Sequence, residues 1–253
     1  MFVGISYKMN LTEKITSEAI AYRRSVRVFQ EDIYIDDTVV ENCIRNATLA
    51  PTSSNLQLWE FIHITTPEIL SEMTVACLDQ NAAKTAKQLV VIVARKDLWK
   101  KRAKANIDFL QKSFGNKSTK EYTKRENFAL NYYKKLIPSI YTDIFGVLGL
   151  LKFVIFKTIG LFRPIYKQVR QSDMRIVAHK SAGLAAQNFM ISMASVGYDT
   201  CPMEGSDTDR IKKLLKLPLG AEINMVIACG IRAENGVYGP QFRVPFEEVY
   251  TKI

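Results

Sequence analysis

The chain has 253 residues, of which 47% are hydrophobic and 24% charged, and its formal net charge is +10. This composition is typical of a globular protein, and the length allows one large domain or two small ones. The four cysteines are far apart and form no C-x-x-C pair, which argues against a zinc site and a disulfide framework. The first residues, MFVGISYKMN, lack the pattern of a secretory signal, so we expect a cytoplasmic protein.

The first third of the chain alternates predicted helices and strands. Asp36 or Asp37 can cap a helix with apolar positions at i, i+3 and i+4, and Pro51 forces its end. The segments 59–65 and 88–95 are short and rich in β-branched residues, which predicts strands, and residues 67–78 between them read as a helix.

The last third predicts a long helix, a short helix and a strand. Residues 173–198 form one apolar pattern with Gly197 near its end, typical of a buried helix. Ser206, with Asp209 three positions later, has the spacing of a capping box. Residues 222–231 read as a fully buried strand. Because the sequence shows neither a repeat nor a Gly/Ser-rich linker, we expect a single domain over 1–253.

The positive charge is concentrated in the middle of the chain. Residues 100–170, called here the basic segment, hold 16 Lys or Arg and four acidic residues, a balance of +12, whereas the other 182 residues sum to −2. This distribution indicates an ordinary domain that carries a basic and apolar helical insertion at about 100–170. We expect no nucleic-acid partner for the protein as a whole.

A cluster of arginines precedes the first predicted helix and strand. Arg23, Arg24 and Arg27 lie within two turns of one another, together with Ser25. Guanidinium groups so close repel each other unless solvent or an anion separates them, and phosphate binds arginine through bidentate hydrogen bonds. The cluster is therefore either a phosphate site or a solvated basic helix end.

Three stretches in order carry a resemblance to a known family. They are RRSVRVF (23–29), APTSSNLQLWEF (50–61) and the stretch from TCPMEG (200–205) to CGI (229–231), followed by FRVPFEEVY (242–250). Together they resemble the flavin-dependent nitroreductases over residues 18–95 and 173–253. The resemblance implies an α+β fold with a central mixed sheet flanked by helices, assembled as an intertwined homodimer.

The resemblance also implies a site for flavin mononucleotide (FMN). It places the first motif against the cofactor, with Arg23 near the phosphate and Arg27 near N1 and O2 of the ring, where a fixed cation would stabilise the charge of the reduced form. It assigns the second motif to ribityl and ring contacts made across the dimer interface. The implied contacts from the two motifs are Arg23, Arg24, Ser25, Arg27, Pro51, Thr52, Ser53 and Asn55. This would explain why polar residues crowd before Trp59 and Phe61, which return to the core.

The third motif and the C-terminal segment complete the implied site. The loop Pro202, Met203, Glu204 and Gly205 resembles the one beside the central ring of the flavin, with backbone amides of Glu204 and Gly205 near N5. Arg243 matches a basic residue that closes over the phosphate. The family often has proline at the position of Leu58 and a second basic residue at that of Gln241. A match near Gln80 and Asn81 leaves open whether they contact the flavin.

Other chemistries lack their sequence patterns. The chain has no G-x-G-x-x-G after a strand, no P-loop and no G-x-S-x-G. Its two histidines, His63 and His179, are expected to have ordinary partners, so we expect no metal site. Cys201 is expected to be buried as a small hydrophobic residue.

The apolar part of the basic segment allows two interpretations. Residues 143–166 are long enough to span a bilayer, but Lys152 and Lys157 would each cost about 2.5–3.5 kcal/mol there, so we expect no spanning helix. The segment is either a helical cover over the active-site mouth or dimer surface, or an amphipathic element that contacts an anionic membrane peripherally.

The resemblance implies an enzyme that uses FMN and NAD(P)H. Such an enzyme would reduce nitroaromatics, quinones or similar small electron-poor acceptors by a ping-pong hydride transfer, with no dedicated catalytic acid or base. One alternative is a non-redox module that binds a membrane or nucleic acid through the basic segment. Another is a specialised flavin reductase acting on enones or removing halogens.

Overall fold

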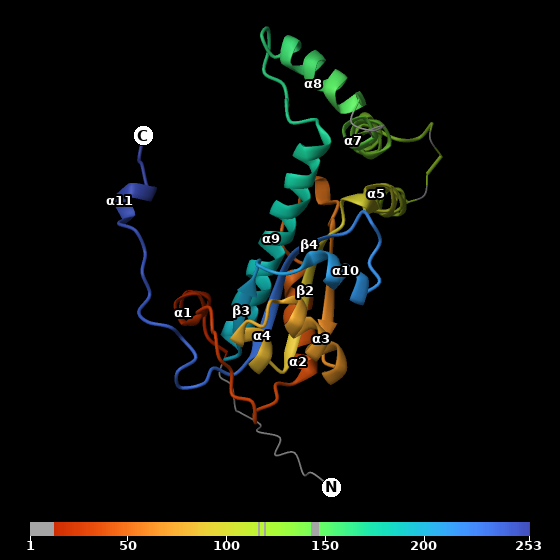
Figure 1. Cartoon of the computed structure of the whole chain (residues 1–253). Coiled ribbons are helices and arrows are strands. Elements are labelled where there is room, and N and C mark those ends of the chain that lie inside the picture. Colours follow the sequence, from red (N-terminus) through yellow and green to blue (C-terminus); the bar gives the residue numbers. More distant parts are fainter. Residues whose placement is uncertain (1–12, 116, 119, 143–146) are drawn as a thin grey trace.

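The chain folds around one small sheet. The computed structural model describes residues 13–115, 117–118, 120–142 and 147–253. The four strands are all antiparallel to their neighbours, in the order β1-β2-β4-β3 (Figure 1). They are β1 (Trp59–Ile64), β2 (Gln88–Ala94), β3 (Asp199–Met203) and β4 (Glu222–Gly230). Parallel pairing in the described residues is confined to an isolated bridge between Ser25 and Thr200. The predicted α+β class is confirmed, but the predicted mixed sheet is wrong, because all its strand pairs in the described residues are antiparallel.

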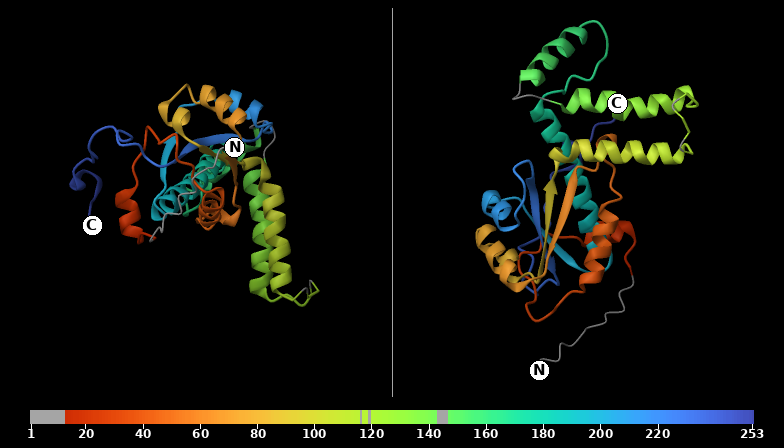
Figure 2. Two further views of the ribbon diagram at one scale, coloured as in Figure 1. Left: turned by 90° about the horizontal axis from the view of Figure 1, so that it is seen from below. Right: turned by 90° about the vertical axis from the view of Figure 1, so that its right-hand side faces the viewer.

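Helices cover both faces of this sheet. The helices that pack around it are α1 (Thr16–Tyr22), α2 (Asp37–Ala47), α3 (Pro67–Ala76), α4 (Asn81–Thr85), α9 (Gln171–Ser195) and α10 (Thr208–Leu214). Seen along the edge of the sheet, α2 and α9 lie on one side and α3 and α10 on the other (Figure 2).

Strand β2 contributes side chains to the hydrophobic cores on both faces of the sheet. All seven of its residues are buried. Successive side chains of a strand point to opposite faces, so the strand serves two cores. Val90, Ile92 and Ala94 join the cluster that contains α2 and α9 residues, whereas Leu89, Val91 and Val93 join the one with α3, α4 and α10. The continuous apolar run is the consequence of burial on both sides.

The predicted ends of the helices follow from local hydrogen bonds. The Asp36 carboxylate accepts a hydrogen bond from the backbone N–H of Thr38 at 2.8 Å and caps α2. At the end of α9, Gly197 has φ +81°. This conformation lets the N–H groups of Gly197 and Tyr198 bond to the last carbonyls of the helix. Both predicted helices are confirmed.

Three sequence predictions need correction. Strand β3 was not expected, and it pairs with β4 from Asp199 to Met203. The cap of α10 is Asp207, whose side chain accepts from the N–H of Arg210 at 2.9 Å, and not Ser206. Strand β4 is fully buried only from Val226 onward. Its first half is partly exposed, because it packs against α9 near the surface of the molecule.

The basic segment forms a helical projection. It contains α5 (Trp99–Ser113), α6 (Lys124–Asn131), a π-helical turn η3 (Tyr132–Leu136), α7 (Ile137–Tyr141) and α8 (Val147–Ile159). Helix α5 runs beside the rod formed by α6, η3 and α7, and the pair projects from the sheet (Figure 2). None of the helices in the described part of the chain combines the length and hydropathy needed to cross a bilayer.

The C-terminal end of the folded core leads to an extended arm. After β4 the chain passes the start of β3 and then leaves the body as an arm, residues 239–253, with a short helix α11 (Phe246–Val249) (Figure 1). Apolar side chains of this arm, including Phe242, Phe246 and Tyr250, are exposed. An arm of this kind is a feature of chains that pack against another surface.

Candidate functional site

The arginine motif follows α1 as an extended segment beside β3. Ser25 forms a bridge with Thr200, and the N–H of Val26 donates to the Thr200 carbonyl at 3.1 Å. On the other side the N–H of Arg27 donates to the carbonyl of Gly236 at 2.6 Å. Val26 is fully buried, so the alternation of an extended chain directs Ser25 and Arg27 to the opposite side.

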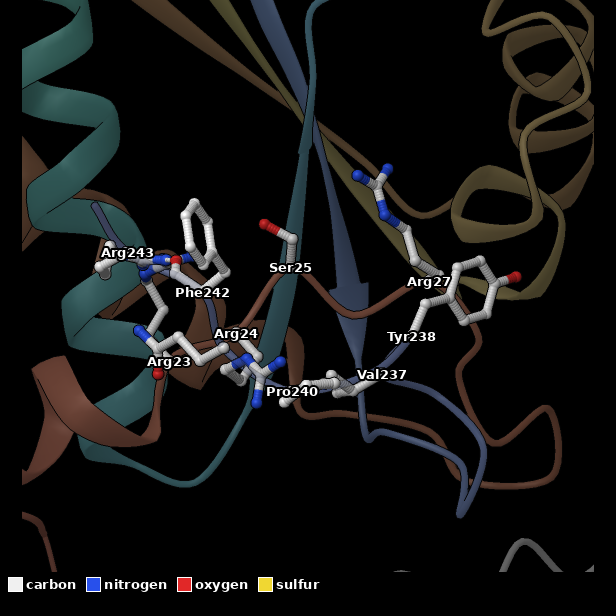
Figure 3. Close-up of a pocket in the computed structure, with 10 residues that line it drawn as sticks. Arg23, Arg24, Ser25, Arg27, Val237, Tyr238, Pro240, Phe242 and Arg243 are labelled. Carbon is white, nitrogen blue, oxygen red and sulfur yellow. Dashed lines mark hydrogen bonds between the residues drawn. The ribbon is translucent and has the colours of Figure 1, made fainter. Parts of the chain in front are cut away.

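The motif and the C-terminal segment line the same pocket. The pocket has a volume of about 290 Å³, and its lining includes Arg23, Arg24, Ser25, Arg27, Tyr238, Gln241 and Arg243. Arg23, Arg24 and Arg243 gather at one end, Arg27 and Tyr238 lie at the other, and Ser25 lies between them (Figure 3). The predicted approach of Arg23 and Arg243 from opposite ends of the sequence is what the fold produces.

Among the residues that the structure describes, the guanidinium groups of this pocket have no carboxylate partners. Within the described residues, no acidic side chain lies within 4.0 Å of the charged groups of Arg23, Arg24, Arg27 or Arg243. Arg24 donates instead to the carbonyl of Gly239 at 2.9 Å, and Arg243 donates to that of Phe242 at 2.6 Å. Burial, followed by the charges of Arg243 and Arg24, lowers the pKa of Arg23. Three partly buried arginines and the exposed Arg243, without an anion among the described residues, fit a phosphate ligand.

The loop after β3 leaves polar groups and space beside this pocket. Pro202 and Met203 end the strand, and Glu204 and Gly205 follow it. A Cβ atom placed at Gly205 would meet no other atom of the described residues within 4 Å, its chain neighbours aside. The hydroxyls of Thr200 and Ser206 are buried, and neither has a hydrogen-bond partner among the described residues. Unpaired buried hydroxyls next to open space indicate room for a polar ligand.

Cys201 lies under this loop and is fully buried, as expected. Burial raises the pKa of its thiol, although Arg27 and Arg23 act in the opposite direction. The thiol is thus protonated at neutral pH and has the properties of a small apolar side chain.

Gln80 and Asn81 connect the two parts of the site. The side-chain amide of Gln80 donates to the Gly205 carbonyl at 2.7 Å, and that of Asn81 donates to the Tyr238 hydroxyl at 3.1 Å. The first bond holds the loop after β3, and the second holds a lining residue of the arginine pocket. The sequence around Gln80 and Asn81 resembles the family motif only loosely, because amide side chains at the start of a helix are common in proteins.

The 51–57 loop lies at a different pocket of the folded chain. Pro51, Thr52 and Ser53 line a second, apolar pocket of about 300 Å³ with Val177 and Leu184 of α9. The arginine pocket and this one share no lining residue. One copy of the chain therefore does not bring the first two motifs together.

The basic segment braces this loop through residues that the sequence did not single out. The hydroxyls of Tyr132 and Ser54 are 2.7 Å apart, the Tyr133 hydroxyl donates to the Ser54 carbonyl at 3.1 Å, and the Asn106 amide donates to the Asn55 carbonyl at 3.0 Å. Ser54 and Asn55 have positive φ angles of 54° and 47°. Non-glycine residues are uncommon in this conformation, so external bonds are needed to hold the loop.

The two histidines belong to structural hydrogen bonds. His63 is 2.7 Å from the Gln88 side chain, and His179 is 3.2 Å from the Glu222 carboxylate. In the described part of the chain, no three His, Cys, Asp or Glu residues are grouped as metal ligands would be.

Comparison with known proteins agrees with this geometry. The family model described as Nitroreductase family matches residues 20–231. Protein DrgA of Synechocystis sp. is 27% identical over 220 residues, which are 87% of this chain and 85% of DrgA. YfkO of Bacillus subtilis, named among the NAD(P)H nitroreductases, is 26% identical over 244 residues, 92% of this chain and 94% of YfkO.

A solved structure shows the same fold. An FMN complex of a protein from Exiguobacterium sibiricum superposes with a TM-score of 0.67 at 18% identity and covers 96% of this chain and 99% of its own. With a family model that matches most of its length, this chain belongs to the Nitroreductase family.

Proposed function

We propose that the protein is an FMN-dependent NAD(P)H oxidoreductase. It acts as a homodimer and reduces nitroaromatics, quinones or similar electron-poor acceptors. NAD(P)H and the acceptor react in turn at one site, as in a ping-pong mechanism. The observation that carries the proposal is the arginine pocket, whose cations come from both ends of the chain and have no acidic partner in the described part of the structure.

Arg23, Arg24 and Arg243 would hold the FMN phosphate. They form one end of the pocket, and a dianion there would offset the burial and the charge repulsion that together lower the pKa of Arg23. Arginine suits this role because its planar group binds phosphate oxygens in pairs. Arg24 also contacts the Gly239 carbonyl, which keeps the segment that carries Arg243 near the pocket.

Arg27 and the loop after β3 would face the ring. FMN supplies two-electron redox chemistry when it is bound. Arg27 would stabilise the negative charge that reduction places at the pyrimidine edge. Ser25 would contact the cofactor between the two ends of the pocket, and Pro202, Met203 and the backbone of Glu204 and Gly205 would lie along the central ring. Gln80 would hold this loop in place through its bond to Gly205. No side chain is assigned as acid or base, and water would supply the proton.

The dimer would complete the site with the 51–57 loop of the other copy. Helix α9 buries one side in the core, yet on its outer side Ile176 and Leu184 are about half exposed, at 48% and 50%. Leu184 also lines the apolar pocket beside the 51–57 loop, and exposed apolar side chains at such a place fit an interaction surface. A second copy seated there would bring its Pro51, Thr52, Ser53 and Asn55 to the flavin, and the C-terminal arms would wrap around the partner.

The visible spectrum of the purified protein tests this proposal. Flavin absorption bands that bleach when NADPH or NADH is added without oxygen would support both the cofactor and the donor. A panel of nitroaromatic, quinone, enone and halogenated acceptors then identifies the acceptor class by reoxidation of the flavin. A colourless protein that takes up no added FMN would overturn the proposal.

A further inference from the structure

Helix α8 exposes an apolar stripe that the redox site does not use. Leu150, Leu151, Val154 and Ile155 are between 46% and 62% exposed. Their spacing of i, i+1, i+4 and i+5 places them on one side of the helix. Leu161 and Phe162, in the turn after α8, are 80% and 85% exposed.

Positive charge predominates around the stripe, and of its nearby cations Arg170 is paired with Asp173. From residue 144 to residue 172 the sequence has no Asp or Glu and five cations: Lys152, Lys157, Arg163, Lys167 and Arg170. Lys157, Arg163 and Lys167 are exposed. Arg170 and Lys157 both lie over the ring of Phe153, which occupies the other side of the helix. The cations thus flank the apolar stripe instead of interrupting it.

The position of α8 leaves this surface accessible. The helix lies at the end of the molecule that is distant from the sheet and from the arginine pocket (Figure 1). Lys152, which is not a stripe residue, donates from its ammonium group to the Thr142 carbonyl at the end of α7.

Charge and polarity together select the partner. We propose that α8 and the following turn, residues 147–167, dock in the interface of an anionic lipid membrane. Apolar side chains of such a helix enter the boundary between headgroups and acyl chains, while flanking lysines and arginines meet anionic headgroups. A second copy of the same segment would oppose like charges, and nucleic acid would gain nothing from the leucines. This surface acts independently of the flavin site.

Vesicle binding of the full-length protein tests the charge requirement. The protein is mixed with vesicles of phosphatidylcholine, alone or with phosphatidylglycerol, and bound protein is separated by flotation. We expect binding to the anionic vesicles that weakens as salt is raised. Lys157→Glu with Lys167→Glu should weaken it at least about tenfold, since each cation near the surface contributes about 1 kcal/mol. The matched control is Lys213→Glu with Lys216→Glu on the body, which makes the same charge change.

A second pair of variants tests the stripe. Leu151→Asp with Val154→Asp should abolish vesicle binding, whereas Val75→Asp with Leu219→Asp, which alters exposed residues far from α8, should not. Circular dichroism and FMN content check that the variants fold. Binding that survives the α8 substitutions, equal binding to neutral vesicles, or binding to duplex DNA instead of vesicles would overturn the proposal.

Discussion

The environment of Arg23 in the folded protein without ligand disfavours its positive charge. Its pKa is lowered by burial and by Arg243 and Arg24, so the native state without ligand carries an electrostatic penalty. Arg23→Gln should therefore raise the thermal stability of the FMN-free protein while weakening FMN binding about 10- to 100-fold, the usual contribution of a hydrogen bond to a charged group.

Thermal unfolding of the FMN-free protein and quenching of FMN fluorescence measure these two effects. The control is Arg45→Gln, an exposed arginine of α2 paired with Glu41, which should leave FMN affinity unchanged. Unchanged FMN affinity in the Arg23 variant would remove Arg23 from the phosphate site.

A substitution at Gly205 can distinguish an effect on folding from an effect on FMN binding. Its backbone is not in the left-handed region, and the space beside it is open. Gly205→Val should alter the free energy of unfolding of the FMN-free protein by less than about 1 kcal/mol. The added methyl groups would occupy the space assigned to the ring, so FMN affinity should fall about tenfold or more. Urea unfolding and FMN titration of the same preparation distinguish the two. A variant that binds FMN normally would show that the ring lies elsewhere.

Glu222 ties the first residue of β4 to α9 and makes this contact sensitive to acid. Burial raises the pKa of Glu222, but hydrogen bonds and charge from Arg175 and His179 outweigh it, and the net shift is below the ordinary value of 4.5. The stabilisation is therefore complete above the unfolded-state pKa and is lost as the pH falls through the lower native value.

Glu222→Gln should lower the free energy of unfolding by about 1 kcal/mol at neutral pH, and the difference from wild type should shrink below about pH 4. Urea titrations at several pH values measure it. The control is Glu72→Gln, which replaces an exposed carboxylate of α3 and should leave the free energy of unfolding nearly unchanged. A constant difference across the pH range would mean that packing, not charge, links β4 to α9.

The elements that the sequence predicted are those whose signal is local. Strand β2 is a continuous apolar run, and α2 has its own cap in Asp36 and its own stop in Pro51. Strand β3 is different, because it contains Asp199 and Pro202 and forms through pairing with β4. Asp199 is buried there by its bonds to Arg232, a partner 33 residues away that no short window contains.

The residues of the candidate site also differ in whether a local sequence signal predicts them. Arg23, Arg24, Ser25, Arg27 and Arg243 were predicted as a group from ordered motifs, and the fold places them in one pocket. Asn106, Tyr132 and Tyr133 were not, since their contacts to the 51–57 loop depend on how α5 and η3 project. The roles of all these residues toward FMN stay predictions until the cofactor is tested.

The proposed FMN site would need two chains, because its two sets of residues line different pockets of one chain. The arginine pocket and the pocket beside the 51–57 loop have no residue in common, although the motif order assigns both to one cofactor. A symmetric dimer resolves this, because each loop can then face the arginines of the other copy. The exposed apolar face of α9 next to the loop supplies the surface on which such a dimer would form.

Subunit mixing distinguishes a shared site from a site within one chain. Arg23→Gln removes a cation from one half-site, and Ser53→Glu places a carboxylate in the other. At an FMN concentration that saturates the wild type but not these weakened sites, each homodimer should then show little FMN-dependent reduction of an acceptor. In an equimolar mixture of co-expressed chains, half of the dimers carry one copy of each variant. If the site is shared, every such mixed dimer has one site with both changes and one with neither, so about a quarter of wild-type activity returns. If both half-sites came from the same chain, every site would carry one change and no activity would return. Purification through two different tags isolates the mixed dimer, whose FMN content should be close to one per two chains if the dimer is built as proposed.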